Sequence, residues 1–277
     1  MEKISVLMSI YNKEKKEYFR QSIESLLKQE YPFDEIVLVI DGPLPKDLYE
    51  EIETQKSLLK DKLVLVKNKE NLGLAKSLNI GIRYCKNEYI ARMDTDDISL
   101  PYRFRIQLDF LKKNPGYSLV GAWYDIYDEN MKNYISTRKV PETFEEIKKF
   151  AKKRTPINHP TIMFKKSDIL KIGGYPENVG RFEDWGLALK LIKNNMLIYN
   201  IPISVLHFRS SIEQMLRRGG IPYLIEEMSV LYKFKEAGFF SNLDFYRNIL
   251  VRTPIRVLPK SIRYEIYKRF IWKNDIF

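Results

Sequence analysis

The sequence has very little cysteine and histidine, and this excludes several kinds of site. Of its 277 residues, one is cysteine (Cys85) and two are histidines (His159 and His207). A single cysteine cannot form an intramolecular disulfide or a cysteine-based zinc site, and two histidines cannot build a histidine-rich metal centre. No apolar stretch reaches the roughly 20 residues of a membrane span, and the first residues lack a signal-peptide cleavage pattern. These absences predict a reduced, cytoplasmic protein.

Glycine-rich phosphate loops are also missing. The segment 71–79 reads Asn-Leu-Gly-Leu-Ala-Lys-Ser-Leu-Asn, which lacks the spacing of a Walker loop, and no Gly-x-Gly-x-x-Gly occurs. P-loop and dinucleotide chemistry are therefore disfavoured. In that segment Gly73 suits a tight turn and Lys76 could contact a phosphate.

The chain carries an excess of positive charge, concentrated at its end. With 44% hydrophobic and 30% charged residues it is globular, and 47 basic against 36 acidic residues give a net charge of +11. Residues 247–277 contribute eight basic and two acidic residues, or +6: Arg247, Arg252, Arg256, Lys260, Arg263, Lys268, Arg269 and Lys273 against Glu265 and Asp275. Such a segment predicts an anionic partner, either nucleic acid, a membrane surface or a phosphorylated substrate. The alternative is a solvated basic helix.

Strand and helix patterns alternate along the first hundred residues. Buried-strand patterns occupy 4–10, 35–40, 62–67 and 88–93, and helical spacing fills 15–30, 47–60 and 74–84. This alternation predicts an α/β fold with a mostly parallel sheet flanked by helices. Later patterns predict helices at 101–113, 143–153 and 186–193 and strands at 118–127, 159–164 and 196–201. Residues 211–237 and 246–273 are expected to be helical, with breaks near Gly219–Pro222, Pro254 and Pro259.

The chain therefore divides near residue 210. Residues 1–210 form the predicted α/β domain, and 211–277 form a basic helical extension. Ligands of open α/β sheets bind beyond the carboxyl ends of the strands. The polar segments at those ends are Tyr11-Asn12, Asp41-Gly42, residues 68–73 and residues 94–97, and they are expected to converge on one crevice.

Three aspartates, Asp94, Asp96 and Asp97, follow the fourth predicted strand within four residues. Like charges this close repel and raise one another's pKa, but a divalent cation among them would make the cluster favourable. Carboxylate oxygens suit Mg²⁺ or Mn²⁺, completed by substrate phosphates and water. The alternative is an acidic loop that caps the next helix through Asp97 or Ser99.

Three further positions carry candidate chemistry. Glu183 and Asp184 precede a predicted helix, where one could act as a general base or both could simply favour the helix dipole. His207 could complete a carboxylate metal site or be a core or surface residue. His159 suits either a structural role or the wall of an acceptor site.

In these residues the chain resembles the inverting family 2 glycosyltransferases, which have the GT-A nucleotide-sugar-binding fold. Six segments match in order: residues 5–12 ending in Tyr-Asn, 35–43, the Asn-x-Gly turn of 71–79, the Asp-x-Asp segment of 91–97, 158–161 with 173–175, and the Phe-Glu-Asp-Trp of 182–185. The resemblance implies a nucleotide-sugar half over about 1–100 and an acceptor half over about 101–210. It is greatest to bacterial enzymes that build capsular, exopolysaccharide or O-antigen repeat units.

The resemblance also implies roles. Tyr11 and Asp41 would contact the nucleotide base, with uracil favoured. Asp94 would hold the ribose or sugar, and Asp96 the metal. Asp184 would deprotonate the acceptor. The implied sets are, for nucleotide-sugar binding, Ser9, Tyr11, Asn12, Asp41, Asn71, Gly73, Lys76, Arg92, Asp94, Thr95 and Asp96; for Mn²⁺ or Mg²⁺, Asp94, Asp96, Asp97 and His207; for catalysis, Asp184 and Glu183; and for the acceptor side, His159, Trp185 and Arg209.

One segment departs from the family pattern. Many members end the second strand in Asp-Asp-Gly-Ser, whereas this chain has Ile40-Asp41-Gly42-Pro43 and keeps one carboxylate. This weakens the assignment of the base contact and leaves the class unaffected.

The acceptor implied by the resemblance is a glycan or a polyprenyl diphosphate at the inner membrane face. Basic and apolar residues interleaved over 247–277 would suit an anionic leaflet. Alternatively, the apolar ones pack onto the catalytic domain or form a homodimer. The competing functions are a nucleotidyltransferase and a basic protein that binds nucleic acid or membrane without catalysis. The missing phosphate loop disfavours the first, and the acidic cluster disfavours a nucleic-acid partner.

Overall fold

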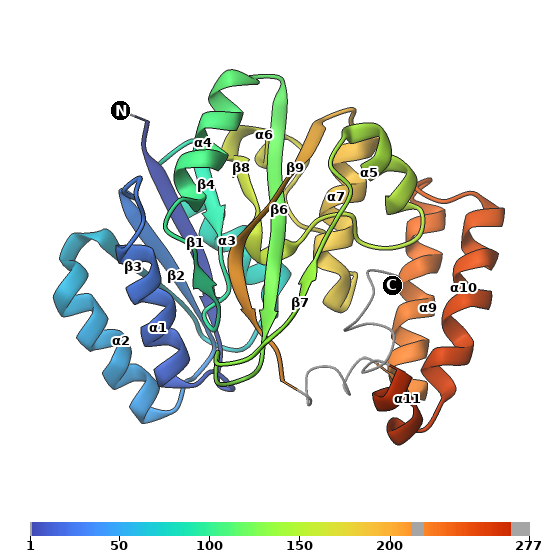
Figure 1. Cartoon of the computed structure of the whole chain (residues 1–277), viewed down its shortest axis with the longest axis horizontal. Coiled ribbons are helices and arrows are strands. Elements are labelled where there is room, and N and C mark those ends of the chain that lie inside the picture. The colour runs from blue at the N-terminus through green and yellow to red at the C-terminus, as the bar shows by residue number, and fades with distance from the viewer. Residues whose placement is uncertain (1, 212–218, 267–277) are drawn as a thin grey trace.

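The computed structural model describes residues 2–211 and 219–266, and Figure 1 shows its layers. The first half contains, in order, β1 (Ile4–Ile10), α1 (Lys16–Leu27), β2 (Glu35–Asp41), α2 (Lys46–Leu59), β3 (Leu63–Asn68), α3 (Leu74–Tyr84), β4 (Tyr89–Arg92), β5 (Ile98–Ser99) and α4 (Arg103–Lys113). The alternation predicted from the sequence is therefore confirmed, with ends shifted by a few residues.

The second half completes the sheet and adds the C-terminal helices. Its elements are β6 (Tyr117–Tyr127), β7 (Tyr134–Arg138), α5 (Phe144–Ala151), β8 (Met163–Lys165), α6 (Lys166–Lys171), α7 (Glu183–Lys193), β9 (Leu197–Arg209), α9 (Ile221–Glu236), α10 (Asn242–Val257) and α11 (Lys260–Ile266). In the described part of the chain, no helix is both long and apolar enough to cross a bilayer.

The nine strands of the described residues form one sheet in the order β3-β2-β1-β4-β8-β6-β9-β5, with β7 beside β6. Strands β1 to β4 pair in parallel, as do β6 and β9. Strand β8 lies antiparallel between β4 and β6, so it joins the two halves of the sheet. The expected parallel sheet is thus found, with antiparallel strands in the acceptor half.

Alternate residues of the central strands supply the two cores of the domain. Met8 and Leu38 face a layer built with α1, α2 and α4, whereas Leu7 and Val37 face a layer built with α3, α5, α6 and α7. All residues of β2 are buried, which is the pattern of a strand covered on both faces.

Several elements differ from the sequence prediction. The segment 159–164 was predicted as one strand, but it is a 3-10 turn (His159–Thr161) followed by β8. Strand β9 continues to Arg209 instead of ending at residue 201, and β7 was not predicted. Helix α10 continues through Pro254. Proline removes the hydrogen bond to the carbonyl four residues before it, and that residue, Leu250, is 73% exposed, so water can take the place of the lost donor.

The C-terminal helices pack against the domain through aromatic side chains and a buried ion pair. Trp185 of α7 contacts Phe234 of α9, with ring centroids 5.3 Å apart. Glu227 of α9, 1% exposed, accepts hydrogen bonds from Arg252 and Arg256 of α10. Burial alone would raise the pKa of Glu227, but these two guanidinium groups outweigh it and lower the pKa.

The positions of the arginines show whether the basic extension faces a partner, solvent or the protein itself. Arg252 also lies over the Trp185 ring at 5.0 Å and donates to the carbonyl of Lys153. Arg263 is buried as well. These arginines face the protein. Lys260 is exposed, and Lys268, Arg269 and Lys273 lie outside the described residues.

We expect Glu227→Gln to lower the free energy of unfolding by about 3 kcal/mol or more, because two guanidinium groups that are only 17% and 14% exposed lose a buried charged partner. Denaturant unfolding measures this. The wild-type contribution is complete above the usual pKa of 4.5 and is lost as the pH falls through the lowered pKa of the folded state. The matched control is Glu50→Gln, whose exposed partner is Lys46, with an expected loss below about 0.5 kcal/mol. Equal losses in the two variants would contradict this account.

Candidate functional site

The three aspartates predicted to bind a metal lie together at the carboxyl end of β4. One carboxylate oxygen from each of Asp94, Asp96 and Asp97 lies within 4.8 Å of the others. The chain reaches this position because β4 ends at Arg92 in the middle of the sheet, and the loop must turn before β5 pairs with β9.

Burial makes this cluster electrostatically costly. It raises the pKa of Asp96 to about 8, and the charges of Asp94 and Glu14 add to the effect. Asp97 is fully buried and its pKa lies well above the usual value for the same reason. Its Oδ1 accepts the backbone N–H of Arg209 at 2.9 Å, while Oδ2 has no hydrogen-bond donor among the described residues. A buried carboxylate oxygen without a donor, next to two other carboxylates, fits a hard divalent cation such as Mg²⁺ or Mn²⁺.

Arg209, at the end of β9, binds the backbone of this loop. Its Nε donates to the carbonyl of Asp96 at 2.8 Å, and its Nη2 donates to Gln21 Oε1 at 2.6 Å. Its guanidinium also lies 3.9 Å from the centre of the Tyr18 ring. Arg209 is thereby fixed against the donor half, and its assignment to the acceptor side stays a prediction.

Arg92 joins the acidic loop to the acceptor half. Its buried guanidinium donates two hydrogen bonds to Asp94, at 2.9 and 2.5 Å. Its charge acts on Glu183, where it opposes the effect of burial and of Asp184; the pKa of Glu183 is nevertheless raised to about 8. One arginine therefore binds the loop predicted to hold the donor and acts through its charge on the segment predicted to hold the base.

Glu183 and Asp184 form the first turn of α7. This is the position that the helix-dipole explanation expected, so dipole stabilisation and catalysis are compatible here. Asp184 Oδ1 accepts the N–H of Trp185 at 2.6 Å. The Trp185 ring itself points into the core and donates to the carbonyl of Ala151 at 2.8 Å, so its role towards an acceptor stays a prediction.

The second strand contributes Asp41, whose carboxylate builds the turn before α3. It accepts the N–H groups of Leu72 at 2.8 Å and Gly73 at 3.0 Å, and the Asn68 side chain at 3.0 Å. Gly73 has a φ of 85°, which favours glycine. The contact of Asp41 with a nucleotide base stays a prediction. Tyr11, Asn12, Asn71 and Lys76 are exposed at this edge.

Neither histidine is among the ligand atoms grouped with the three aspartates in the described residues. His207 pairs in the sheet with Ile98, the residue after Asp97; its ring lies 4.5 Å from that of Tyr127, and burial lowers its pKa. His159 is buried, and its Nε2 lies 2.9 Å from the Tyr175 hydroxyl. The roles of His207 in metal binding and of His159 towards the acceptor stay predictions.

Glu14 is a site residue that the sequence reasoning missed. Its carboxylate accepts a hydrogen bond from the Thr95 hydroxyl, inside the acidic loop. Burial raises the pKa of Glu14, and the charge of Asp94 adds to this effect. The available signal was its place two residues beyond Asn12, at the carboxyl end of the first strand.

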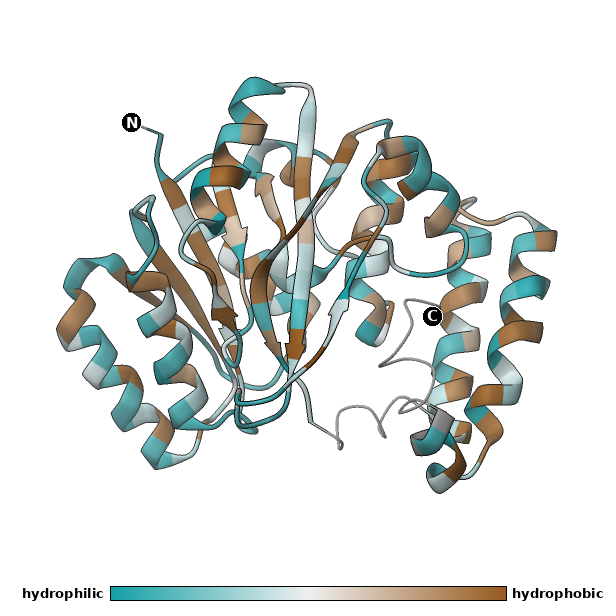
Figure 2. Cartoon of the chain, in the orientation of Figure 1, coloured by the Kyte–Doolittle hydropathy of each residue, from teal (hydrophilic) through white to brown (hydrophobic). Residues whose placement is uncertain are grey.

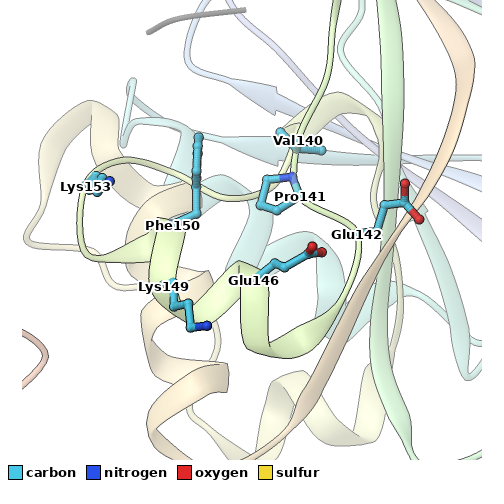
Figure 3. A pocket seen from close by; sticks show the side chains of 7 residues that line it. All are labelled: Val140, Pro141, Glu142, Glu146, Lys149, Phe150 and Lys153. Atoms are coloured by element: carbon cyan, nitrogen blue, oxygen red, sulfur yellow. The ribbon is translucent and has the colours of Figure 1, made fainter.

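A hollow of about 410 Å³ lies elsewhere, beside α5 (Figure 3). The charged groups of Glu142, Lys149 and Lys153 are spread around it and do not converge. The fourth charged residue, Glu146, is occupied in the capping box with Thr143. No part of the acidic loop lines this hollow.

The fold and the site define a class of protein, and comparison with known proteins agrees with it. The chain has an α/β fold with a mixed sheet, and an aspartate loop lies at the carboxyl ends of the parallel strands. This is the arrangement of a GT-A glycosyltransferase. The family model "Glycosyl transferase family 2" matches residues 5–173, and the chain belongs to this family.

Named relatives extend over the whole chain. An Escherichia coli UDP-Gal:alpha-D-GlcNAc-diphosphoundecaprenol beta-1,3-galactosyltransferase is 35% identical, covering 97% of this chain and 96% of the relative. The amylovoran biosynthesis glycosyltransferase AmsE of Erwinia amylovora is 34% identical, covering 96% and 98%. The solved structure of S. aureus TarS with UDP-GlcNAc has a TM-score of 0.61 at 18% identity, covering 84% of this chain and 66% of that one. The last similarity concerns the fold alone.

We expect Glu14→Gln to weaken Mn²⁺ binding by about tenfold or more, because residues that support ligating carboxylates typically have effects of this size. The glutamine keeps an acceptor for Thr95 and removes one negative charge beside Asp96. Isothermal titration with Mn²⁺ alone measures the affinity. Glu17→Gln, an exposed residue in the first turn of α1, is the control and should bind Mn²⁺ like the wild type. Unchanged affinity in Glu14→Gln would show that Glu14 does not support the cation.

Proposed function

We propose that this protein transfers a sugar from a UDP-sugar to a hydroxyl of a lipid-linked glycan during the assembly of a bacterial surface polysaccharide. The observation that carries the proposal is Arg92, which is hydrogen-bonded to Asp94 of the acidic loop and whose charge acts on Glu183 in the first turn of α7. Donor chemistry and acceptor deprotonation require such groups on two sides of one centre. The names of the relatives from E. coli and E. amylovora support the substrate class.

The donor is expected to bind at the carboxyl ends of β1, β2 and β4. Tyr11 presents an exposed ring there, 39% accessible, which can stack on a base. The turn of Asn71 and Gly73, held by Asp41, presents backbone at the same edge. UDP is favoured among nucleotides because the E. coli relative is named for UDP-Gal and the TarS structure contains UDP-GlcNAc.

Asp94, Asp96 and Asp97 would hold the Mn²⁺ or Mg²⁺ ion, since their oxygens lie within 4.8 Å of one another. Such an ion supplies charge compensation for the departing diphosphate. Arg92 and Arg209 keep the loop in place by hydrogen bonds to the Asp94 side chain and the Asp96 carbonyl. His207 remains the proposed additional ligand.

Asp184 is the proposed general base. A base must be unprotonated to accept the acceptor's proton. Burial and the charge of Asp184 raise the pKa of Glu183, which favours Asp184 over Glu183 for this role. Asp184 takes the proton as the acceptor oxygen attacks the anomeric carbon. The nucleoside diphosphate leaves from the opposite face in the same displacement, and this inverts the anomeric centre.

Family membership favours this function over the alternatives of a nucleotidyltransferase and a nucleic-acid-binding protein. A lipid-linked acceptor would place the protein peripherally at the inner face of the cell membrane. Association into a homodimer stays a prediction.

Thermal unfolding should show a stabilisation by UDP that depends on Mn²⁺, and Asp96→Asn should remove it. A ligand at about one hundred times its Kd stabilises the folded state by about 2.7 kcal/mol, which is readily measured. Asp109→Asn, on the exposed side of α4, is the control and should keep the full shift. If Asp96→Asn shows the same Mn²⁺-dependent shift as the wild type, the proposed donor site is wrong.

The two neighbouring acids can be separated by transfer assays. Asp184→Asn should lower kcat by a factor of about 10² to 10⁴ while the Mn²⁺-dependent shift with UDP is retained. Glu183→Gln should lose much less, because glutamine resembles the protonated carboxyl. The assay uses UDP-galactose and UDP-GlcNAc as donors and a GlcNAc-diphosphate lipid as acceptor. A larger loss in Glu183→Gln than in Asp184→Asn would reverse the assignment.

A further inference from the structure

A second groove, far from the acidic loop, has strongly cationic walls. It has a volume of about 340 Å³ and lies between α5, α7 and α10. Its floor is apolar and includes Leu189, Ile192 and Phe239. The charged residues that line it are five cations and one carboxylate: Lys148, Lys149, Lys152, Lys193 and Arg247 against Glu145.

The lysines of this groove keep their ammonium groups accessible. The side chains of Lys148 and Lys152 are 43% and 56% exposed. Lys148 lies 3.7 Å from Glu145, and these are residues three apart on an exposed helix. Lys152 and Arg247 lie 3.8 and 3.2 Å from the carboxylate of Asp244 on α10. Exposed pairs of this kind are weak, and the five cations outnumber the two carboxylates, so the wall keeps a net positive charge.

Helix α10 presents an exposed apolar stripe beside this groove. Leu243, Tyr246, Leu250 and Val257 are 76%, 59%, 73% and 53% exposed. Their spacing of three, four and seven residues places them on one side of the helix, and hydrophobic bands recur along α10 in Figure 2. The most exposed residues of 242–259 carry no charge: Asn242, Leu243, Tyr246, Leu250, Val251, Pro254, Val257 and Pro259.

Arg247 makes the groove and the stripe continuous. It lines the groove, and on α10 it lies four residues after Leu243 and three before Leu250, so it borders both. We call this combination the α5–α10 surface: Lys148, Lys149, Lys152, Lys193 and Arg247 with Leu243, Tyr246, Leu250 and Val257. Figure 1 places it at the end of the molecule opposite α2.

We infer that the α5–α10 surface docks on an anionic lipid bilayer, with the α10 stripe in the interface and the cations at the headgroup phosphates. Exposed apolar side chains bordered by cations are the pattern of a helix that lies in a membrane interface. The inference deepens the proposed function and rests on it for the lipid-linked acceptor. It places the contact on the outer side of α10 and the end of α5, whereas Arg252 and Arg256 of the C-terminal extension bind Glu227.

The same features disfavour two other occupants. In a symmetric pair of chains, a residue patch meets its own copy, so an interface through the stripe would bring two cationic grooves together. Nucleic acid would be attracted by the lysines but would leave Leu243 and Leu250 without a partner. An anionic bilayer matches both parts of the surface.

The charge contribution can be tested by flotation of the full-length protein with vesicles of phosphatidylcholine alone or mixed with phosphatidylglycerol. We expect binding only to the anionic vesicles, weakening with salt. Each basic residue near such a surface contributes about fivefold in affinity, so Lys148→Gln/Lys149→Gln should bind about 25-fold more weakly. The matched control is Lys112→Gln/Lys113→Gln, an equally adjacent and exposed pair in the last turn of α4, and it should bind like the wild type.

Insertion of the stripe can be followed at a single label. Cys85 is buried, so an environment-sensitive fluorophore will attach to Leu250→Cys, or to Leu58→Cys on α2, which is 66% exposed. Anionic vesicles should shift the emission of the first label to shorter wavelength and leave the second unchanged. A shift at position 250 that requires no vesicles and grows with protein concentration would assign the stripe to a second copy. A shift with DNA and not with vesicles would assign it to nucleic acid. Either result overturns the inference.

The two proposals fail separately. If the Lys148/Lys149 double variant and its control bind vesicles equally, or if the label at position 250 does not respond, the α5–α10 surface is not the membrane contact. The Mn²⁺-dependent shift with UDP would then still stand as the test of the donor site. If vesicle binding behaves as expected while no nucleotide stabilises the protein, the docking surface holds and the transferase proposal fails.

Discussion

The site depends on the repulsion among three aspartates and on the two arginines that offset it. Asp94, Asp96 and Asp97 lie within 4.8 Å of one another, an arrangement that burial makes unfavourable for charged carboxylates. Arg92 binds the Asp94 side chain from within the sheet, and Arg209 binds the loop backbone from β9. The uncompensated remainder, including Asp97 Oδ2, is the reason why we propose this loop as a cation site.

The same arginine connects the acidic loop with helix α7. Arg92 ends β4, binds Asp94 and acts through its charge on Glu183 at the start of α7. Asn79 provides a second connection, because its side chain both donates to and accepts from the backbone of Tyr175, at 2.9 and 2.8 Å. These polar contacts, together with β8 between β4 and β6, fix the first turn of α7 relative to the acidic loop. Catalysis by a positioned base requires this kind of rigidity.

The basic extension directs part of its positive charge into the protein. Arg252 and Arg256 are used inside the protein, where Glu227 and the aromatic rings of Trp185 and Tyr223 receive them. Their inward orientation turns the apolar side of α10 to the exterior. A helix that looks basic in the sequence therefore presents an outer face of uncharged residues, and the accessible cations beside it are Arg247 of α10 itself and lysines of α5 and α7.

The sequence by itself determined the parallel first half, the acidic loop and the order of the motifs. Hydrophobic periodicity identifies the strands and helices, their alternation predicts a mostly parallel sheet, and the strand ends indicate where polar residues gather. The sequence could not give the length of β9, the continuity of α10 through Pro254, or the roles of Glu14 and Arg209, because these depend on contacts between distant segments. Thr95 meets Glu14 across 81 residues, and Arg209 meets Asp97 across 112. Only the tertiary structure decided those contacts and which side of α10 faces outward, since burial is a property of the packed chain.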